Sequence, residues 1–131
     1  MKILIVDDDK LSRVMLYNML NSVGQCDMAI NGYEAIDAFK RSHAEGAPYD
    51  LICLDVIMPD IDGLQVLKQI RAIETRDSID ASEAVKVIMV SSMSDLEHIM
   101  MSFNASCEAY MIKPFERNLL FEHLAAFGFE V

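Results

Sequence analysis

"ILIVDDDK", residues 3–10, places four apolar residues directly before three aspartates. Two like charges about 4 Å apart repel by roughly 4 kcal/mol at an effective dielectric constant of 20. The run of Asp7, Asp8 and Asp9 therefore lowers stability unless a bound cation, the N-terminus of a helix or exposure to water offsets the repulsion. An apolar run that ends in clustered carboxylates predicts a buried strand followed by a polar site.

Length and composition predict one folded domain over residues 1–131, with 53% hydrophobic and 24% charged residues. The net charge is -10 and no Lys/Arg cluster interrupts it, which argues against direct nucleic-acid binding. The first apolar run is too short for a signal peptide or a membrane span, so we expect no membrane insertion and a cytoplasmic location. Cys26, Cys53 and Cys107 lack metal-binding spacing and are expected to be buried free thiols.

Apolar runs without polar alternation occupy residues 3–6, 51–54 and 85–90, where only Lys86 interrupts. Such runs are typical of a parallel sheet that is covered by helices on both faces. Weaker strands are expected over 26–30 and 109–112. Segments of helical periodicity separate and follow the strands, with first apolar positions at Leu11, Tyr33, Leu64, Leu96 and Leu119. The alternation predicts a doubly wound α/β fold of five parallel strands and five helices.

One polar stretch, "ETRDSIDASEA" at residues 74–84, is longer than the usual connection in such a fold. Polar connections of this length generally run over the surface and are more mobile than the elements that they join. We therefore expect a mobile surface loop that begins at Glu74 and ends at Ala84. The sequence assigns it no further role.

Polar residues follow the predicted strands where each one ends. Asp7 and Asp8 follow the first strand, Asp55 the third, Ser91 the fourth and Lys113 the fifth. In an open parallel sheet the carboxyl ends of the strands share one edge, where ligands bind. We expect these five side chains to converge on one site.

Asp9 and the five residues named above also have purely structural interpretations. Asp9 directly precedes a helical segment and is expected to be its N-cap. The two aspartates before it could be loop carboxylates, Ser91 a turn hydroxyl and Lys113 a solvated strand-end charge. Asp55 is harder to explain in this way, because a lone charge at the end of a buried strand is costly without a partner.

The chemistry that fits all five residues is phosphoryl transfer to a carboxylate. Mg²⁺ prefers oxygen ligands and is usually held by one or two carboxylates together with phosphate oxygens and water. One Mg²⁺ and Lys113 would balance the charge of three carboxylates. A carboxylate can attack phosphorus to give an aspartyl phosphate, while cationic and hydroxyl groups stabilise the transferring oxygens. A bound cation is thus one answer to the clustering of the aspartates.

The motifs "ILIVDDD", "LICLDVIMPDIDG", "VIMVSSM" and "AYMIKPF" resemble, in order and spacing, the receiver domain of two-component response regulators. The resemblance covers essentially the whole chain and is to the single-domain type, similar to chemotaxis response regulators. It implies a flavodoxin-like sheet of strand order 2-1-3-4-5. It also implies a phosphoacceptor signalling domain rather than an enzyme, over residues 1–131 with no output domain.

Applied residue by residue, the resemblance makes Asp55 the phosphoacceptor. Asp8 and Asp55 would bind Mg²⁺ directly, Asp7 would act through water, and the backbone carbonyl of Ile57 would complete the protein ligands. Lys113 resembles the family lysine that precedes a proline, so the bond to Pro114 is expected to be cis.

The resemblance also implies a switch. Ser91 corresponds to the family hydroxyl that is drawn toward the phosphoryl group, and Tyr110 to the aromatic that then rotates. The surface formed by the fourth helix, fifth strand and fifth helix would change shape and bind a downstream protein target. This face also allows a homodimer. Tyr110 could instead be a half-buried strand aromatic.

Apolar side chains occupy two positions beside the phosphoacceptor, Ile57 and Met93, where many family members carry polar groups that could orient an attacking water. We therefore expect slow autodephosphorylation. Met93 also belongs to a methionine cluster near the switch face, which is either an adaptable contact surface or ordinary core. The other members are Met100, Met101 and Met111.

The chain lacks a glycine-rich nucleotide loop, so the resemblance implies that the phosphoryl group comes from a sensor histidine kinase or a histidine phosphotransfer protein. His43, His98 and His123 have no shared acidic context and are expected to be surface or packing residues. Two alternatives remain open from the residues. They are a phosphatase with an Asp nucleophile, and a degenerate receiver that signals by binding alone.

Overall fold

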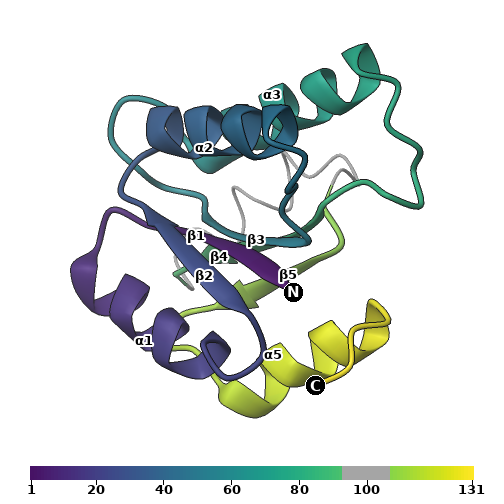
Figure 1. The fold of residues 1–131 in the computed structure, drawn as a ribbon. Helices are drawn as coiled ribbons and strands as arrows, with labels where there is room; N and C mark the ends of the chain where they lie inside the picture. The colour runs from purple at the N-terminus through teal and green to yellow at the C-terminus, as the bar shows by residue number, and fades with distance from the viewer. Residues whose placement is uncertain (93–106) are drawn as a thin grey trace.

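The computed structural model describes residues 1–92 and 107–131. Its five strands form one parallel sheet in the order β2-β1-β3-β4-β5, with helices on both faces (Figure 1). The strands are β1 Lys2–Val6, β2 Gln25–Ala29, β3 Leu51–Asp55, β4 Lys86–Ser91 and β5 Ala109–Ile112. The helices are α1 Lys10–Leu20, α2 Gly32–Ala44, α3 Gly63–Arg76 and α5 Arg117–Ala126.

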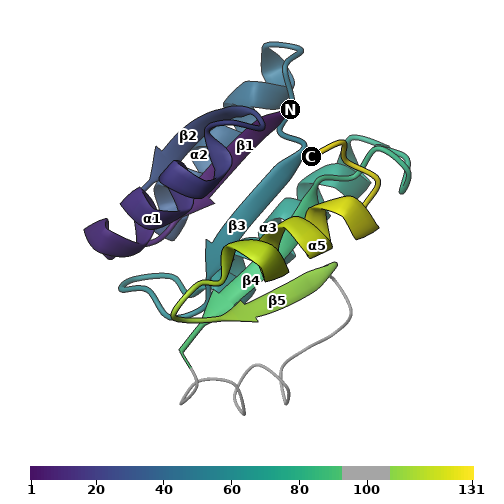
Figure 2. The same cartoon turned by 90° about the horizontal axis from the view of Figure 1, so that it is seen from below.

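The sheet separates two hydrophobic cores. Helices α2 and α3 cover one face, and α1 and α5 cover the other (Figures 1 and 2). Alternate residues of each strand point to opposite faces, so neighbouring positions supply different cores. In β3, for example, Ile52 belongs to the same core as Phe39 of α2, whereas Cys53 belongs to the other core, with Leu16 of α1. The central strands are therefore apolar at nearly every position, which explains the uninterrupted runs in the sequence.

The predicted strand order and alternation of elements are confirmed, with four helices in the part of the chain that the structure describes. The further helix that we expected around Leu96 falls between residues 93 and 106, outside the described residues. The thiols of Cys53 and Cys107 are buried and free as predicted, whereas Cys26 is partly exposed. This difference arises because Cys26 lies on the edge strand β2.

Side chains at the start of three helices close their first turns. Asp9 caps α1, and its carboxylate accepts hydrogen bonds from the Ser12 N–H at 3.1 Å and the Ser12 Oγ at 2.8 Å. This confirms the predicted N-cap, and the hydrogen bonds from Ser12 lower the pKa of Asp9. Asn31 caps α2, and Asp62 caps α3 in a reciprocal capping box with Gln65.

The prediction of a surface loop over residues 74–84 is wrong about where the loop begins. Glu74 lies inside α3 and is only 5% exposed, because its carboxylate binds Arg71 and accepts a hydrogen bond from the Val85 N–H at 2.8 Å. The helix runs on to Arg76 and ends in a Schellman motif, in which Ser78 adopts a positive φ of 57°. Only the residues after this turn form the connection to β4.

None of the helices in the described residues is both long enough and apolar enough to cross a membrane.

Candidate functional site

The carboxyl ends of the strands bring the predicted polar residues to one edge of the sheet. Asp7 directly follows β1, Asp55 ends β3, Ser91 ends β4 and Lys113 directly follows β5. Carboxylate oxygens of Asp7, Asp8 and Asp55 all lie within 4.8 Å of one another. The structure thus brings together residues that lie far apart in the sequence.

Lys113 joins two buried carboxylates. Its Nζ lies 3.0 Å from Asp7 Oδ2 and 3.6 Å from Asp55 Oδ2, while Asp7 is 1% and Asp55 5% exposed. Burial alone would lower the pKa of Lys113. The hydrogen bond with Asp7 and the attraction of both carboxylates outweigh this effect, so the pKa of Lys113 is raised. The lysine therefore remains a fixed ammonium group within the site.

The carboxylate of Asp55 is strained electrostatically. Burial raises the pKa of Asp55 to about 7, and repulsion from Asp7 and Asp8 adds to the shift. The attraction of Lys113 opposes it without cancelling it. Because the ionised form of Asp55 is disfavoured at this position, a further positive charge nearby would favour it.

The residues present fit a divalent cation such as Mg²⁺. Asp7 Oδ2 is buried, and its contact in the described part of the chain is the ammonium group of Lys113, at 3.0 Å. One ammonium group faces three carboxylates, so the cluster has an excess of negative charge. Clustered carboxylate oxygens are the ligands that Mg²⁺ prefers in proteins. Ile57 lies two residues after Asp55, on the loop between β3 and α3, and its side chain is half-exposed.

Contacts within the β1–α1 loop hold Asp7 in place. Its Oδ1 accepts a hydrogen bond from the Asp9 N–H at 2.9 Å, and its backbone carbonyl accepts one from Arg13 Nη1 at 2.8 Å. Arg13 is a positioning residue that sequence reasoning missed. The sequence marks Arg13 only weakly. Its one distinguishing feature is that it lies one helical turn after the Asp9 N-cap, from where its side chain can reach back to the loop.

The β3–α3 loop packs tightly against the strand that carries Asp55. The Gly63 N–H donates to the Val56 carbonyl at 2.8 Å, and the Val56 N–H donates to the Val90 carbonyl at 2.9 Å. A Cβ atom at Gly63 would collide with the backbone carbonyl oxygen of Asp55. Gly63 was also missed as a site residue, and its only signal was its place at the end of the aspartate-rich loop.

We expect Gly63→Ala to lower the free energy of unfolding by about 2 to 3 kcal/mol, because α3 must move away from the Asp55 carbonyl. Gly46→Ala is the matched control, since a Cβ there meets no atom within 4 Å and only the positive φ of 71° opposes it. That strain costs about 1 kcal/mol. Urea denaturation measures both variants, and equal losses would contradict the close-approach argument.

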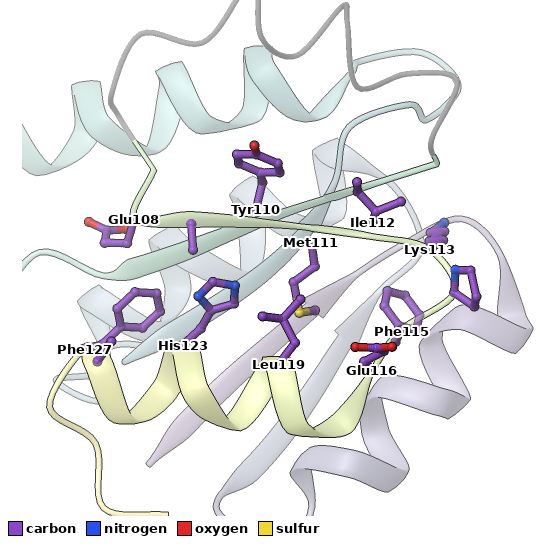
Figure 3. A pocket seen from close by; sticks show the side chains of 13 residues that line it. Glu108, Tyr110, Met111, Ile112, Lys113, Phe115, Glu116, Leu119, His123 and Phe127 are labelled. Atoms are coloured by element: carbon purple, nitrogen blue, oxygen red, sulfur yellow. The ribbon is translucent and has the colours of Figure 1, made fainter.

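Ser91 and Tyr110 lie on the last two strands. Ser91 is buried, and its Oγ donates to the Ser92 carbonyl at 3.2 Å. The Lys113–Pro114 peptide bond is cis, as predicted. Tyr110 is 37% exposed and points from β5 away from α5 (Figure 3). Met93, the second apolar position predicted beside the phosphoacceptor, lies outside the described residues.

Comparisons with known proteins agree on one family. The sequence model of the response regulator receiver domain matches residues 3–125. Chemotaxis protein CheY of Bacillus subtilis (strain 168) is 30% identical over 123 residues, which cover 92% of this chain and 92% of that protein. Hybrid signal transduction histidine kinase L of Dictyostelium discoideum is 32% identical over 128 residues, which cover 97% of this chain but only 7% of the kinase.

Among solved structures, the response regulator TrrA of Thermotoga maritima in complex with Mg²⁺ and BeF has a TM-score of 0.75 and 28% sequence identity. The match covers 96% of this chain and 97% of that one. The likeness therefore extends over the whole sheet, including the edge where the carboxylates gather.

Proposed function

The chain belongs to the response regulator receiver domain family of two-component signalling, and on that basis we propose that Asp55 accepts the phosphoryl group. The observation that carries the proposal is the position of Lys113 Nζ, 3.0 Å from Asp7 and 3.6 Å from Asp55. An ammonium group held between two buried carboxylates is suited to bind a phosphoryl oxygen beside the nucleophile.

In the proposed reaction an oxygen of Asp55 attacks the phosphorus of a phosphohistidine. The O–P bond forms as the P–N bond breaks, and the histidine nitrogen leaves. Lys113 stabilises the oxygens of the transferring group, and the Ser91 hydroxyl donates a hydrogen bond to one of them. The aspartyl phosphate is later released by hydrolysis, and Asp55 is thereby restored.

Asp8, Asp55 and the Ile57 carbonyl would hold Mg²⁺ directly, and Asp7 would hold it through water. When bound, Mg²⁺ supplies positive charge that neutralises the transferring phosphoryl group. The acidic cluster of three carboxylates supports this assignment. The raised pKa of Asp55 supports it further, because a carboxylate that resists ionisation gains most from a bound cation.

The test is the intact mass of the protein after incubation with Mg²⁺ and acetyl phosphate. We expect wild type to gain one phosphate that hydroxylamine removes, and Asp55→Asn to gain none. Asp60→Asn is the matched control, because Asp60 lies on the same loop and asparagine tolerates its positive φ of 69°. Equal phosphorylation of wild type and Asp55→Asn would refute the assignment.

The same measurement separates the two alternatives. Steady release of free phosphate by both wild type and Asp55→Asn would favour a phosphatase, although the family match makes that reading the weaker one. Wild type that binds Mg²⁺ without gaining phosphate would be a degenerate receiver that acts by binding alone. We propose that the protein itself catalyses its phosphorylation from acetyl phosphate, without a kinase.

Ser91 and Tyr110 form the proposed switch. The hydrogen bond that the Ser91 hydroxyl donates to the Ser92 carbonyl is long, at 3.2 Å, so little would be lost when the hydroxyl turns toward a phosphoryl group. Tyr110 would then move inward and change the surface around β5 and α5, which binds a downstream protein target or a second copy of the chain. Such a local charge change can bias an element with two arrangements.

Slow autodephosphorylation is a further expected property. The half-exposed side chain of Ile57 cannot hydrogen-bond an attacking water. Ile57→Asn should therefore speed the Mg²⁺-dependent loss of phosphate about tenfold, because an amide can orient that water. The decay of the phosphorylated mass measures both rates. Rapid loss from wild type, or no change in the variant, would contradict this expectation.

A sensor histidine kinase or a histidine phosphotransfer protein is the proposed donor. Two of the relatives are histidine kinases, and the chain spans 7% and 10% of their lengths. Relatives of this kind support a histidine-linked donor without identifying the cognate one. The cytoplasmic location stays a prediction.

A further inference from the structure

Strand β2 forms the edge of the sheet opposite to β5 (Figure 2). Within residues 1–92 and 107–131 it pairs with β1 alone. Strands β1 and β3 separate it from β4 and β5, the two strands that residues 93–106 connect. Along this edge Met28 is 51% and Ile30 is 48% exposed. Exposed apolar side chains on an edge strand favour pairing with a further strand.

The backbone groups of Cys26 and Met28 face away from the sheet. The Gln25 N–H and the Ala29 carbonyl form hydrogen bonds, at 2.9 and 3.2 Å, with the residues that flank β1. Residues 25 and 29 therefore face β1. Because backbone groups point alternately to the two sides of a strand, those of residues 26 and 28 point outward.

A second copy of the chain can pair with this edge in an antiparallel register centred on Met28. Met28 then lies opposite Met28 of the second copy, and Cys26 lies opposite Ile30. The two Met28 residues exchange both of their hydrogen bonds, and each Cys26 N–H donates to an Ile30 carbonyl. The Ile30 N–H is not needed, and it already donates to Glu34 Oε1 at 3.1 Å.

The neighbouring registers are less favourable. A register centred on Asp27 places two Asp27 carboxylates directly opposite each other, and like charges in that position are destabilising. A register centred on Ala29 places Met28 opposite Ile30 and needs the Ile30 N–H, which Glu34 holds. The edge of β2 thus favours the register centred on Met28.

Helix α2 lies beside this edge and carries opposite charges along it. Ala38 and Arg41 of α2 line a cavity of about 290 Å³ together with Met28 of β2. Glu34 belongs to the same flank of the helix, because residues three and four positions apart are neighbours on a helix surface. Its hydrogen bond with the Ile30 N–H also places it beside the end of β2. The flank therefore has an acid near one end and a base near the other.

Pairing through β2 brings the two copies of α2 to an ordinary packing distance. Helix α2 contacts both β2 and β1, so each helix lies about one strand spacing from the two-fold axis. The two helices are then about 10 Å apart, which is within the range of packed helices.

The register of β2 also sets the register of the two helices. Two residues of a strand and four residues of a helix both span about 6 Å. Since Glu34 lies beside Ile30, Ala38 lies beside Met28. A two-fold axis through Met28 therefore places the small Ala38 side chains opposite each other. Glu34 then lies near Arg41 of the second copy, because these residues lie four and three positions to either side of Ala38.

We propose that two copies of the chain pair through the outer edges of β2 and form one continuous sheet, with Glu34 of each copy next to Arg41 of the other. The net charge of -10 on each copy opposes association, but physiological salt screens this repulsion beyond about 8 Å. Because the sheets pair antiparallel, their carboxyl edges point in opposite directions and both Asp55 sites stay accessible. This interface is separate from the surface around β5 and α5, and it needs no phosphoryl group.

The test uses unphosphorylated protein with a chelator present. In sedimentation equilibrium we expect the mass to rise from one chain toward two as the protein concentration increases. Over the same range, hydrogen exchange should slow at the Cys26 and Met28 amides. The Asp27 amide, which faces β1, should exchange at an unchanged rate.

Met28→Lys should weaken the dimer at least about tenfold, because it places two lysines directly opposite each other at the two-fold axis. The side chain is half-exposed, so the fold should tolerate the change. Leu119→Lys is the matched control, since Leu119 is a partly exposed leucine on α5, beside the opposite edge of the sheet. It should change the dissociation constant less than about threefold.

A charge exchange tests the contact between the helices. Arg41→Glu and Glu34→Arg should each weaken the dimer about tenfold, because each places like charges together. An equimolar mixture of the two variants should form mixed dimers with nearly the affinity of wild type, since opposite charges meet again. Lys40→Glu makes the same charge change at a neighbouring α2 residue that does not line the cavity, and it should have little effect. Loss of the Glu34 bond to Ile30 cannot produce the recovery in the mixture.

Three results would overturn the proposal. The first is a monomer at every concentration. The second is a dimer that Leu119→Lys weakens and Met28→Lys does not, which would lie on the α5 side of the molecule. The third is a mixture of Arg41→Glu and Glu34→Arg that stays as weakly associated as each variant alone. None of these results bears on phosphorylation of Asp55, which the mass measurement tests separately.

Discussion

Asp55→Asn should stabilise the protein by roughly 2 to 4 kcal/mol near pH 8 in the absence of divalent cations, although it removes the proposed nucleophile. In wild type, burial and two neighbouring carboxylates raise the pKa of Asp55 to about 7. The unfolded chain ionises this group near its ordinary pKa of 3.8. Above pH 7 the folded protein must therefore hold a charge that the unfolded chain carries at lower cost, and asparagine has no such charge.

The sign of the pH dependence follows from proton binding. Between the unfolded pKa of 3.8 and the folded pKa of about 7, the folded protein binds more protons at Asp55 than the unfolded chain does. The contribution of Asp55 to stability therefore falls as pH rises through this window and is constant above it. The advantage of Asp55→Asn should grow from near zero at about pH 4 to its full value at about pH 8.

Urea denaturation of wild type and Asp55→Asn across this pH range, with a chelator present, measures the effect. Asp60→Asn again serves as the control, because it removes a carboxylate from the same loop without touching the cluster. Added Mg²⁺ should stabilise wild type more than Asp55→Asn, since a ligand that binds only the folded state raises its stability. Equal stability of the two proteins near pH 8 would show that Asp55 is not destabilised by its neighbours.

Glu74→Ala should lower the free energy of unfolding by about 3 kcal/mol, the largest loss that we expect from a single side chain away from the cluster of Asp7, Asp8 and Asp55. Glu74 is 5% exposed, and its Oε1 lies 2.7 Å from Arg71 Nη1. Its Oε2 accepts a hydrogen bond from the Val85 N–H at 2.8 Å. Truncation leaves that buried N–H without its partner and removes an ion pair from a partly desolvated arginine, and both effects are destabilising.

Arg76→Ala is the comparison variant, because its ion pair with Asp77, at 3.1 Å, is exposed on the same helix. Exposed pairs contribute less than about 1 kcal/mol. Glu74→Gln should lose less than Glu74→Ala, since an amide oxygen can still accept from the Val85 N–H. Urea denaturation measures the free energy of unfolding of each variant. If Glu74→Ala lost no more stability than Arg76→Ala, burial would add nothing to the Arg71–Glu74 ion pair.

Much of the fold and of the site could be predicted from the sequence because the signals are local. Apolar runs and helical periods depend on residues close together in the chain, and they predicted the five strands and the four described helices. The meeting of Asp7, Asp55 and Lys113 was also predictable, because parallel strands bring their carboxyl ends to one edge. No knowledge of individual contacts was needed for either step.

Tertiary structure alone decided the features that depend on contacts between distant residues. Glu74 appeared to begin a polar loop, yet it is buried because Arg71 and the distant Val85 N–H satisfy its carboxylate. The close approach of Gly63 to the Asp55 carbonyl arises from the angle at which α3 meets the sheet. The outer edge formed by β2 and α2 likewise requires a strand and a helix to lie side by side. Sequence patterns record which residues are apolar or charged, whereas these features follow from which backbone atoms and side chains meet after folding.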